Sequence, residues 1–124
     1  MVFYRGPYRH ILFAPDAAAT LEEAKGHVRP QVRESCTAQL YRVLMRLGDF
    51  QQVRNTELFR SEGKGIFAVK ARCGLRGYGW FKTLASGESA FIVSHFILKK
   101  RQAANPSDID QAVAARENME RKDD

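Results

Sequence analysis

The chain has 124 residues and a formal net charge of +6, with 44% hydrophobic and 27% charged residues. A chain of this length is expected to form one domain, residues 1–124, with a modest core, and its composition excludes a disordered or low-complexity protein. It contains no apolar run of about 18 residues, and its start lacks the layout of a secretion signal. We therefore expect a cytoplasmic protein without a membrane span.

The cysteines and histidines limit the redox and metal chemistry that the sequence predicts. Cys36 and Cys73 lie far apart and form no CxxC motif. In a reducing cytosol such a pair is expected as free thiols rather than as a disulfide. His10, His27 and His95 have no ligand-like spacing among themselves. No bound metal and no cofactor are therefore expected.

The N-terminal half predicts two short apolar segments followed by two helices. Residues 2–4 and 11–13 are apolar, and a Gly-Pro pair separates them. The second predicts a strand and the first an extended arm. An Asp cap and a terminal Gly predict a helix over residues 17–25. Apolar residues at steps of three and four predict a longer helix over residues 30–48, whose arginines are interpreted mainly as a solvated face.

The C-terminal half predicts a small sheet and one more helix. Residues 49–64 are polar and irregular, whereas residues 65–72, 78–84 and 89–99 have strand character with short Gly-containing turns between them. Three such strands predict an antiparallel meander, and a Pro-Ser start predicts a final helix over residues 106–120. The expected fold is α+β, with two N-terminal helices on one face of a mostly antiparallel sheet and the C-terminal helix packed at its end.

Positive charge is concentrated in the middle of the chain. Residues 60–101 contain nine Lys and Arg against two Glu, which gives them a net charge of +7. This distribution is typical of a face that binds a polyanion, although a solvated basic surface remains an equal alternative. The basic and aromatic candidates for substrate binding are Lys70, Arg72, Lys82, Lys100, Arg101, Tyr78 and Trp80. Tyr78 and Trp80 are interpreted either as base-stacking rings or as core residues.

One ordered set of residues near the C-terminus resembles a known family. An apolar strand is followed by a His, an aromatic residue, two Lys, a Pro and an acidic helix start, in the order His95, Phe96, Lys99, Lys100, Pro106, Asp108, Ile109 and Ala112. This set resembles the C-terminal signature of RelE/HigB-like toxins of type II toxin–antitoxin modules, in particular the phage-derived HigB-like branch. The resemblance extends more weakly back to about Leu58. It implies a RelE-like fold, a toxin that cuts mRNA on the ribosome, and a cognate antitoxin, often of the helix-turn-helix type.

The chemistry of such a toxin assigns roles to three residues. The 2′-OH of the RNA is the nucleophile, so basic side chains and a proton carrier suffice without a metal. The catalytic candidates are His95, Lys99 and Arg76. His95 and Lys99 share a strand face if that strand is regular, and the pKa of a His suits proton transfer. The alternative for His95 is a structural histidine in the sheet, and the alternative for Lys99 is a cation that protects a strand end.

The sequence also departs from the family pattern. Ala68 stands where the family usually has Glu, and Lys70 where it usually has Arg. The family's strand Arg falls closer to Trp80 than to Arg76, and no Tyr or His follows His95. These departures favour an alternative function, namely a catalytically weak or inactive module that binds nucleic acid or an antitoxin.

Overall fold

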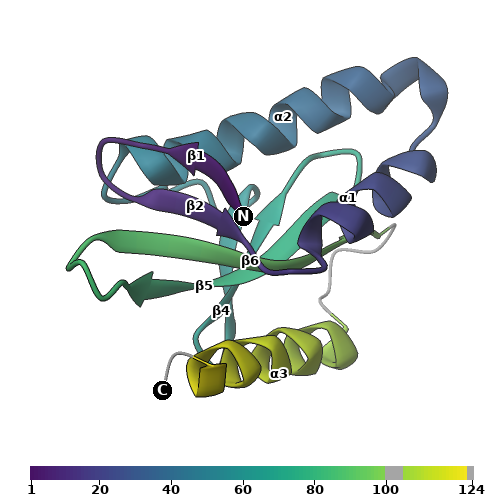
Figure 1. Ribbon diagram of the computed structural model, residues 1–124. Coiled ribbons are helices and arrows are strands. Elements are labelled where there is room, and N and C mark those ends of the chain that lie inside the picture. Colours follow the sequence, from purple (N-terminus) through teal and green to yellow (C-terminus); the bar gives the residue numbers. More distant parts are fainter. Residues whose placement is uncertain (100–104, 123–124) are drawn as a thin grey trace.

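A six-stranded sheet lies between two helical layers in the computed structural model, which describes residues 1–99 and 105–122 (Figure 1). The strand order is β1-β2-β6-β5-β4-β3, and only the β2–β6 pair is parallel. The elements are β1 (Val2–Arg5), β2 (His10–Phe13), α1 (Ala17–Gly26), α2 (Pro30–Asp49), β3 (Phe59–Gly63), β4 (Ile66–Lys70), β5 (Leu75–Thr83), β6 (Ser89–Leu98) and α3 (Pro106–Lys122). The predicted α+β class and mostly antiparallel sheet are confirmed.

The long helix α2 forms where the sequence predicts it. Pro30 stands in its first turn, and its buried apolar residues recur at steps of three and four. Its C-terminal end is closed by Arg9, whose guanidinium donates to the carbonyl oxygens of Leu47 (2.6 Å) and Phe50 (3.0 Å). A buried cation at this end satisfies carbonyl groups that have no partner inside the helix.

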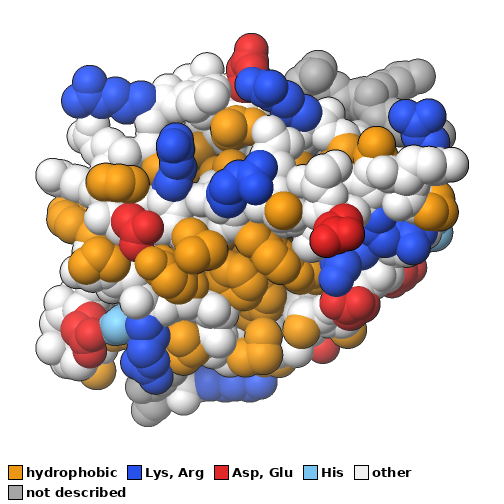
Figure 2. Space-filling view, turned by 90° about the horizontal axis from the view of Figure 1, so that it is seen from above, with side chains coloured by type: hydrophobic (Ala, Val, Ile, Leu, Met, Phe, Trp, Pro, Cys, Tyr) orange, Lys and Arg blue, Asp and Glu red, His pale blue; other side chains and the backbone are white. Residues whose placement is uncertain are grey.

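The layer of α1 and α2 buries the larger of two hydrophobic cores against the sheet. Leu21 of α1, Leu44 of α2 and Phe91 of β6 belong to this core. The outer surface of the layer carries a hydrophobic area with charged side chains around it (Figure 2). Met1 and Met45 are among the exposed apolar residues of the chain, with 70% and 38% of their surface accessible. None of the described helices has the length and apolar character that a membrane span requires.

The strand β4 confirms the predicted alternation. Ile66 and Ala68 pack on the α3 side of the sheet, whereas Phe67 and Val69 pack on the α1 and α2 side. This alternation follows from the two-residue period of a strand. It also orients Lys70, which shares the face of Ile66 and Ala68.

The prediction of an irregular segment over residues 49–64 is wrong at its C-terminal end. Residues 59–63 form β3, which pairs with β4 and extends the meander from three strands to four. This strand lies at the edge of the sheet with an exposed face, so it includes polar residues such as Arg60 and Ser61. The sequence of this segment therefore lacks the apolar pattern from which a strand is predicted. The next turn is also shorter than predicted, since β5 begins at Leu75 rather than at Tyr78.

The predicted position of the C-terminal helix is wrong as well. The helix α3 covers the second face of the sheet, opposite α1 and α2, instead of packing at the end of the sheet (Figure 1). Ala112 of α3 is fully buried in a core that includes Ile66, Trp80 and Ile92. These sheet residues form an apolar row that only a second helical layer can remove from water.

The prediction of two free thiols is also overturned. Cys36 of α2 and Cys73 of the turn between β4 and β5 form a disulfide, and their Cα atoms are 5.9 Å apart. The two cysteines are 37 positions apart in sequence and are brought together because α2 packs against β4 and β5. Sequence spacing alone does not reveal such a long-range approach.

Candidate functional site

Five of the predicted site residues meet on the α3 face of the sheet. Strand pairing places Arg76 opposite Lys70, and Tyr78 opposite His95. The rings of Tyr78 and His95 stack with their centroids 5.4 Å apart. Lys99 follows directly after β6 and has an ion pair with a residue of α3. Three cations, one histidine and one tyrosine thus share one site, which we call the basic cluster.

A bulge in β6 decides which face His95 occupies. Tyr78 pairs with His95, but the next residue, Gly79, pairs with Val93, so that Ser94 is extra. Phe91 and Val93 pack on the α1 and α2 side. Strict alternation would have placed His95 on that side too, and the extra residue moves it to the α3 side. The hydroxyl of Ser94 also forms a hydrogen bond of 2.9 Å with His95 Nδ1.

The predicted common face of His95, Ile97 and Lys99 is therefore present. Ile97 packs against the core beneath α3. His95 and Lys99 both reach the same residue of α3, and the shared partner is Asp108.

Asp108 is the site residue that the sequence analysis did not single out for a role. Its Oδ2 atom lies 3.0 Å from Lys99 Nζ, and its Oδ1 atom lies 3.4 Å from His95 Nε2. The start of α3 places it there, since the side chain of Asn105 accepts from the backbone N–H of Ser107 at 3.0 Å. The available signal was an acidic residue in the first turn of a helix, which is too common a feature to mark a site.

Glu62 is the second carboxylate that the sequence did not suggest. It comes from the edge strand β3 and lies 3.9 Å from Lys70 Nζ. Both side chains are largely buried, with 12% and 6% of their surface accessible. Glu62 and Asp108 thus place carboxylates beside Lys70 and Lys99 in the basic cluster.

Burial changes the proton affinities of the cluster. It lowers the pKa of His95, and the neighbouring Asp108 opposes this change. It also lowers the pKa of Lys70, and the cationic Arg76 lowers it further. The pKa of Tyr78 is raised by burial, while Arg76 acts in the opposite direction. His95 is therefore neutral at neutral pH and able to accept a proton.

The cluster is closed in this conformation. His95 is 2% exposed, Lys70 5% and Arg76 4%. A cavity of about 300 Å³ reaches His95 from the side, between α1 and α3, and its lining includes Thr20, His27 and Gln111. A ligand in this cavity contacts the cluster at His95, whereas Lys70 and Arg76 do not line the cavity.

The two aromatic candidates lie in the core beneath α3. Tyr78 is fully buried and Trp80 is 3% exposed. Their burial fits the alternative in which they are core residues. The hydroxyl of Tyr78 is buried near the guanidinium of Arg76, which lowers the pKa of Tyr78 against the effect of burial.

The remaining candidates lie apart from the cluster. Arg72 is exposed in the turn after β4, where its backbone N–H donates to Gln39 of α2 at 2.7 Å. Lys82 lies near the far end of β5, four residues beyond Tyr78. Lys100 and Arg101 lie outside the described residues.

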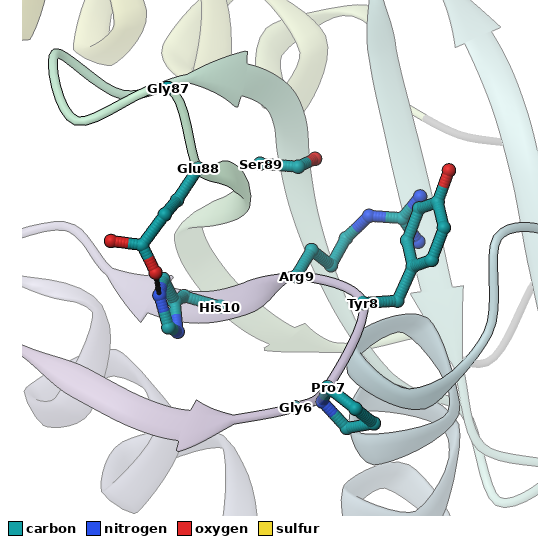
Figure 3. Close-up of a pocket in the computed structure, with 8 residues that line it drawn as sticks. All are labelled: Gly6, Pro7, Tyr8, Arg9, His10, Gly87, Glu88 and Ser89. Carbon is teal, nitrogen blue, oxygen red and sulfur yellow. Dashed lines mark hydrogen bonds and ion pairs between the residues drawn. The ribbon is translucent and has the colours of Figure 1, made fainter.

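A second polar cavity lies at the opposite end of the sheet. It has a volume of about 420 Å³ and lies between the β1–β2 turn and the turn before β6 (Figure 3). His10 and Glu88 form an ion pair at its edge, which holds the pKa of Glu88 below its usual value. The guanidinium of Arg9 stacks on the ring of Tyr8, but its terminal nitrogens already bind backbone carbonyls. This cavity therefore lacks the free cations of a phosphate site.

Comparison with known proteins adds no assignment. No protein-family model, no curated protein and no solved structure matches the chain. Among residues 1–99 and 105–122, no three His, Cys, Asp or Glu side chains come together as metal ligands. Function has to be inferred from the basic cluster itself.

Proposed function

We propose that the protein is an endoribonuclease that cuts mRNA with the RNA 2′-OH as nucleophile, and that it acts as the toxin of a type II toxin–antitoxin module. The observation that supports this proposal best is the convergence of Lys70, Arg76, Tyr78, His95 and Lys99 on one face of the sheet. Cleavage of RNA at a 2′-OH requires a base, cations around the scissile phosphate and a proton donor. The basic cluster offers each of these groups.

The roles follow from the protonation states. Neutral His95 takes the proton of the 2′-OH as this oxygen attacks phosphorus. Lys99 and Arg76 stabilise the charge that grows on the phosphoryl oxygens. The P–O5′ bond breaks, and the leaving oxygen takes a proton, so that a 2′,3′-cyclic phosphate and a 5′-OH result. Tyr78, whose pKa is raised, is protonated and stacks on His95, and it donates the proton to the leaving oxygen.

Asp108 suggests how RNA would enter the site. Its carboxylate is an anion that lies against Lys99 and His95, which is where the scissile phosphate has to bind. Entry of RNA thus exchanges one anion for another and displaces the first turn of α3. This exchange is favourable because the phosphate carries its charge into a site that already binds an anion.

The partners belong to the same proposal. The resemblance of residues 89–112 to RelE/HigB-like toxins supports mRNA on the ribosome as the substrate and a cognate antitoxin as the protein partner. A helix-turn-helix antitoxin with an acidic segment would suit a chain with a net charge of +6.

A second function is favoured by the burial of His95. A His that is 2% exposed and bonded on both ring nitrogens fits a structural role as well. In that case the protein binds RNA or an antitoxin without cleaving RNA. The missing Tyr or His after His95 and the Lys at position 70 support this alternative.

Controlled expression in a bacterial host, with mRNA 5′ ends mapped before and after induction, tests the proposal. We expect new 5′ ends within translated codons for the wild type, and a loss of about 100-fold for Lys99→Ala. Lys25→Ala is the matched control, because Lys25 also has one carboxylate partner, Glu22 at 3.1 Å, but lies on α1. Equal cleavage by both variants would show that Lys99 takes no part in the reaction.

The binding alternative is tested with the purified chain. RNA affinity that falls steeply with salt, without any cleavage even when ribosomes are present, would support the binding module. Absence of both arrest and RNA binding would contradict both functions.

A further inference from the structure

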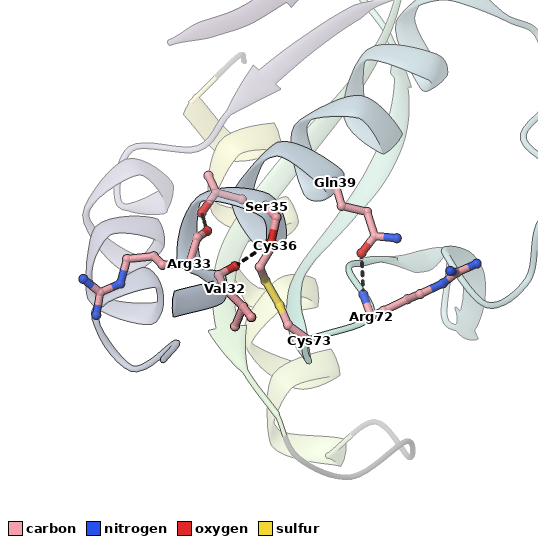
Figure 4. The surroundings of a disulfide bond; sticks show 8 residues. Val32, Arg33, Ser35, Cys36, Gln39, Arg72 and Cys73 are labelled. Atoms are coloured by element: carbon pink, nitrogen blue, oxygen red, sulfur yellow. Dashed lines mark hydrogen bonds between the residues drawn. A yellow bond between two sulfur atoms is a disulfide. The ribbon is translucent and has the colours of Figure 1, made fainter. Parts of the chain in front are cut away.

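The Cys36–Cys73 disulfide joins α2 to the turn between β4 and β5, residues 71–74 (Figure 4). Cys36 is 5% exposed, whereas Cys73 is exposed at the surface. The same turn has a second tie to α2, since the backbone N–H of Arg72 donates to the Gln39 side chain at 2.7 Å (Figure 4). The turn is thus held to the helix by one covalent bond and one hydrogen bond.

The other side of this turn contacts the basic cluster. The backbone N–H of Lys99 donates to the carbonyl oxygen of Gly74 at 2.9 Å. The turn also separates Lys70 from Arg76, which pair across β4 and β5 directly beside it. A shift of the turn therefore acts on Lys99, which contacts it directly, whereas Lys70 and Arg76 stay paired in the β4–β5 ladder.

The contact between the turn and Lys99 is close. Gly74 has a φ of 102°, and a Cβ atom at this position would lie 2.0 Å from the carbonyl oxygen of Lys99. No other residue type fits here without a shift of the backbone. A shift of Gly74 therefore displaces Lys99, and it also affects Asp108 through the ion pair between Lys99 and Asp108.

We propose that Cys36–Cys73 is a redox-active disulfide that dithiol reductants open at Cys73, and that its redox state sets the position of the β4–β5 turn in the basic cluster. The effect on RNA cleavage rests on the proposed function, whereas the redox reaction and the movement of the turn do not. Thiol–disulfide exchange requires that an attacking thiolate can reach one of the two sulfurs, and Cys73 is exposed.

The reaction balances with a dithiol as the reductant. A thiolate of the dithiol attacks Cys73 Sγ, which is the accessible sulfur, and Cys36 leaves as a thiolate and takes up a proton. The second thiol of the reductant then attacks the reductant's other sulfur, which is bonded to Cys73 in the mixed disulfide. Cys73 leaves as a thiolate and takes up a proton. The protein gains two electrons and two protons, and the dithiol is oxidised to a disulfide.

Opening the disulfide loosens the turn without detaching it. The hydrogen bond between Arg72 and Gln39 and the β4–β5 ladder remain, so the change is expected to be local. The backbone N–H groups of Gly74 and Lys99 lie at this turn, so their rates of hydrogen exchange measure how readily it opens. The N–H of Ala14, which donates to Val93 at 2.9 Å, lies at the β2–β6 junction and serves as an internal reference.

The test compares amide hydrogen exchange of the full chain before and after treatment with dithiothreitol, with thiols counted by mass spectrometry. We expect no free thiol before treatment, two after it, and an acceleration of exchange at Gly74 and Lys99 that exceeds the acceleration at Ala14 by about 10-fold or more. The Cys36→Ser/Cys73→Ser variant should show the fast exchange at all times and no response to dithiothreitol.

Three outcomes would overturn the inference. These are two free thiols in the oxidant-treated wild type, unchanged exchange at Gly74 and Lys99 after reduction, or acceleration of exchange at Gly74 and Lys99 to the same extent as at Ala14, which would mark a purely structural disulfide. An RNA-cleavage assay on both redox forms separates this inference from the proposed function. Absence of cleavage in both forms counts against the ribonuclease and leaves the exchange result intact.

Discussion

The carboxylate of Asp108 lies 3.0 Å from the ammonium nitrogen of Lys99, and it is the same carboxylate that reaches His95. The two partners of this ion pair are 16% and 13% exposed, so the pair is only partly screened by water. It connects the start of α3 to the end of β6 and closes the basic cluster. Its loss should therefore affect the stability of the protein and the proton affinity of His95 together.

The Asp108→Asn variant tests this connection. Without the carboxylate the pKa of His95 should fall further, because Asp108 is the group that raises it against the effect of burial. The free energy of unfolding should fall by about 1–2 kcal/mol, since a hydrogen-bonded charge pair in a partly buried site is lost. NMR titration of the His95 ring and chemical denaturation measure the two effects.

Asp110→Asn is the control for this variant. Asp110 pairs with Lys64 at 3.3 Å, but both side chains are more than 60% exposed. Such a pair contributes about 0–1 kcal/mol, and its removal should leave the His95 titration unchanged. Equal effects of the two variants would show that Asp108 has no special relation to His95.

The burial of His95 predicts a dependence of stability on pH. Its pKa in the folded state is lowered from 6.5, so the unfolded chain takes up a proton at a higher pH than the folded protein does. The stabilising contribution is complete above pH 6.5 and is lost as the pH falls through this value towards the lower pKa of the folded state. When the pH falls from about 7.5 to about 5.5, the free energy of unfolding of His95→Gln should therefore decrease less than that of the wild type.

His27→Gln serves as the control, because His27 is exposed. Denaturation curves of the three proteins at both pH values provide the comparison. A wild type and a His95→Gln variant with the same pH dependence would contradict the burial of a neutral His95.

The disulfide predicts a large change in global stability when both cysteines are replaced. It closes a loop of 37 residues, and a cross-link over such a loop stabilises a protein by about 3 kcal/mol, largely by restricting the unfolded chain. Cys36→Ser/Cys73→Ser should lose about this amount in chemical denaturation under oxidising conditions. A reductant should bring the wild type close to the variant and leave the variant unchanged. Identical curves for the oxidised wild type and the variant would argue against the bond.

Two glycines with similar backbone conformations should differ in their tolerance of a side chain. Gly74 and Gly87 have φ angles of 102° and 88°, so an Ala is strained at either position by about 1–3 kcal/mol. At Gly87 no atom lies within 4 Å of the added Cβ, whereas at Gly74 the carbonyl oxygen of Lys99 lies 2.0 Å away. Gly74→Ala should therefore lower the free energy of unfolding by about 2 kcal/mol more than Gly87→Ala. Similar losses for both would mean that the turn is free to move away from Lys99.

The elements whose formation depends on local chemistry were predicted well. The Pro at the first turn of α2 and the apolar stripe behind it define this helix, and the alternation of Ile66, Phe67 and Ala68 defines β4. The edge strand β3 was missed, because it has few apolar residues and is stabilised mainly by its ladder with β4. Such pairing depends on a neighbour that a local pattern does not contain.

The candidate site was predicted only as far as its residue types. The sequence marked Arg76, His95 and Lys99 and the charge around them, and it left Tyr78 and Trp80 open between base stacking and the core, in which the structure buries both. Asp108 and Glu62 were not recognised, since each reaches the cluster from an element whose docking is a long-range event.

By itself the sequence determined the α+β class, the helices and a basic middle segment, because propensity, periodicity and charge are properties of neighbouring residues. Only the tertiary structure decided that the extra residue at Ser94 turns His95 towards α3, that Asp108 covers it, and that Cys36 meets Cys73. Each of these depends on the register of a strand pair or on the face that a helix covers. Those choices minimise the exposed apolar surface of the whole chain, and no single segment encodes them.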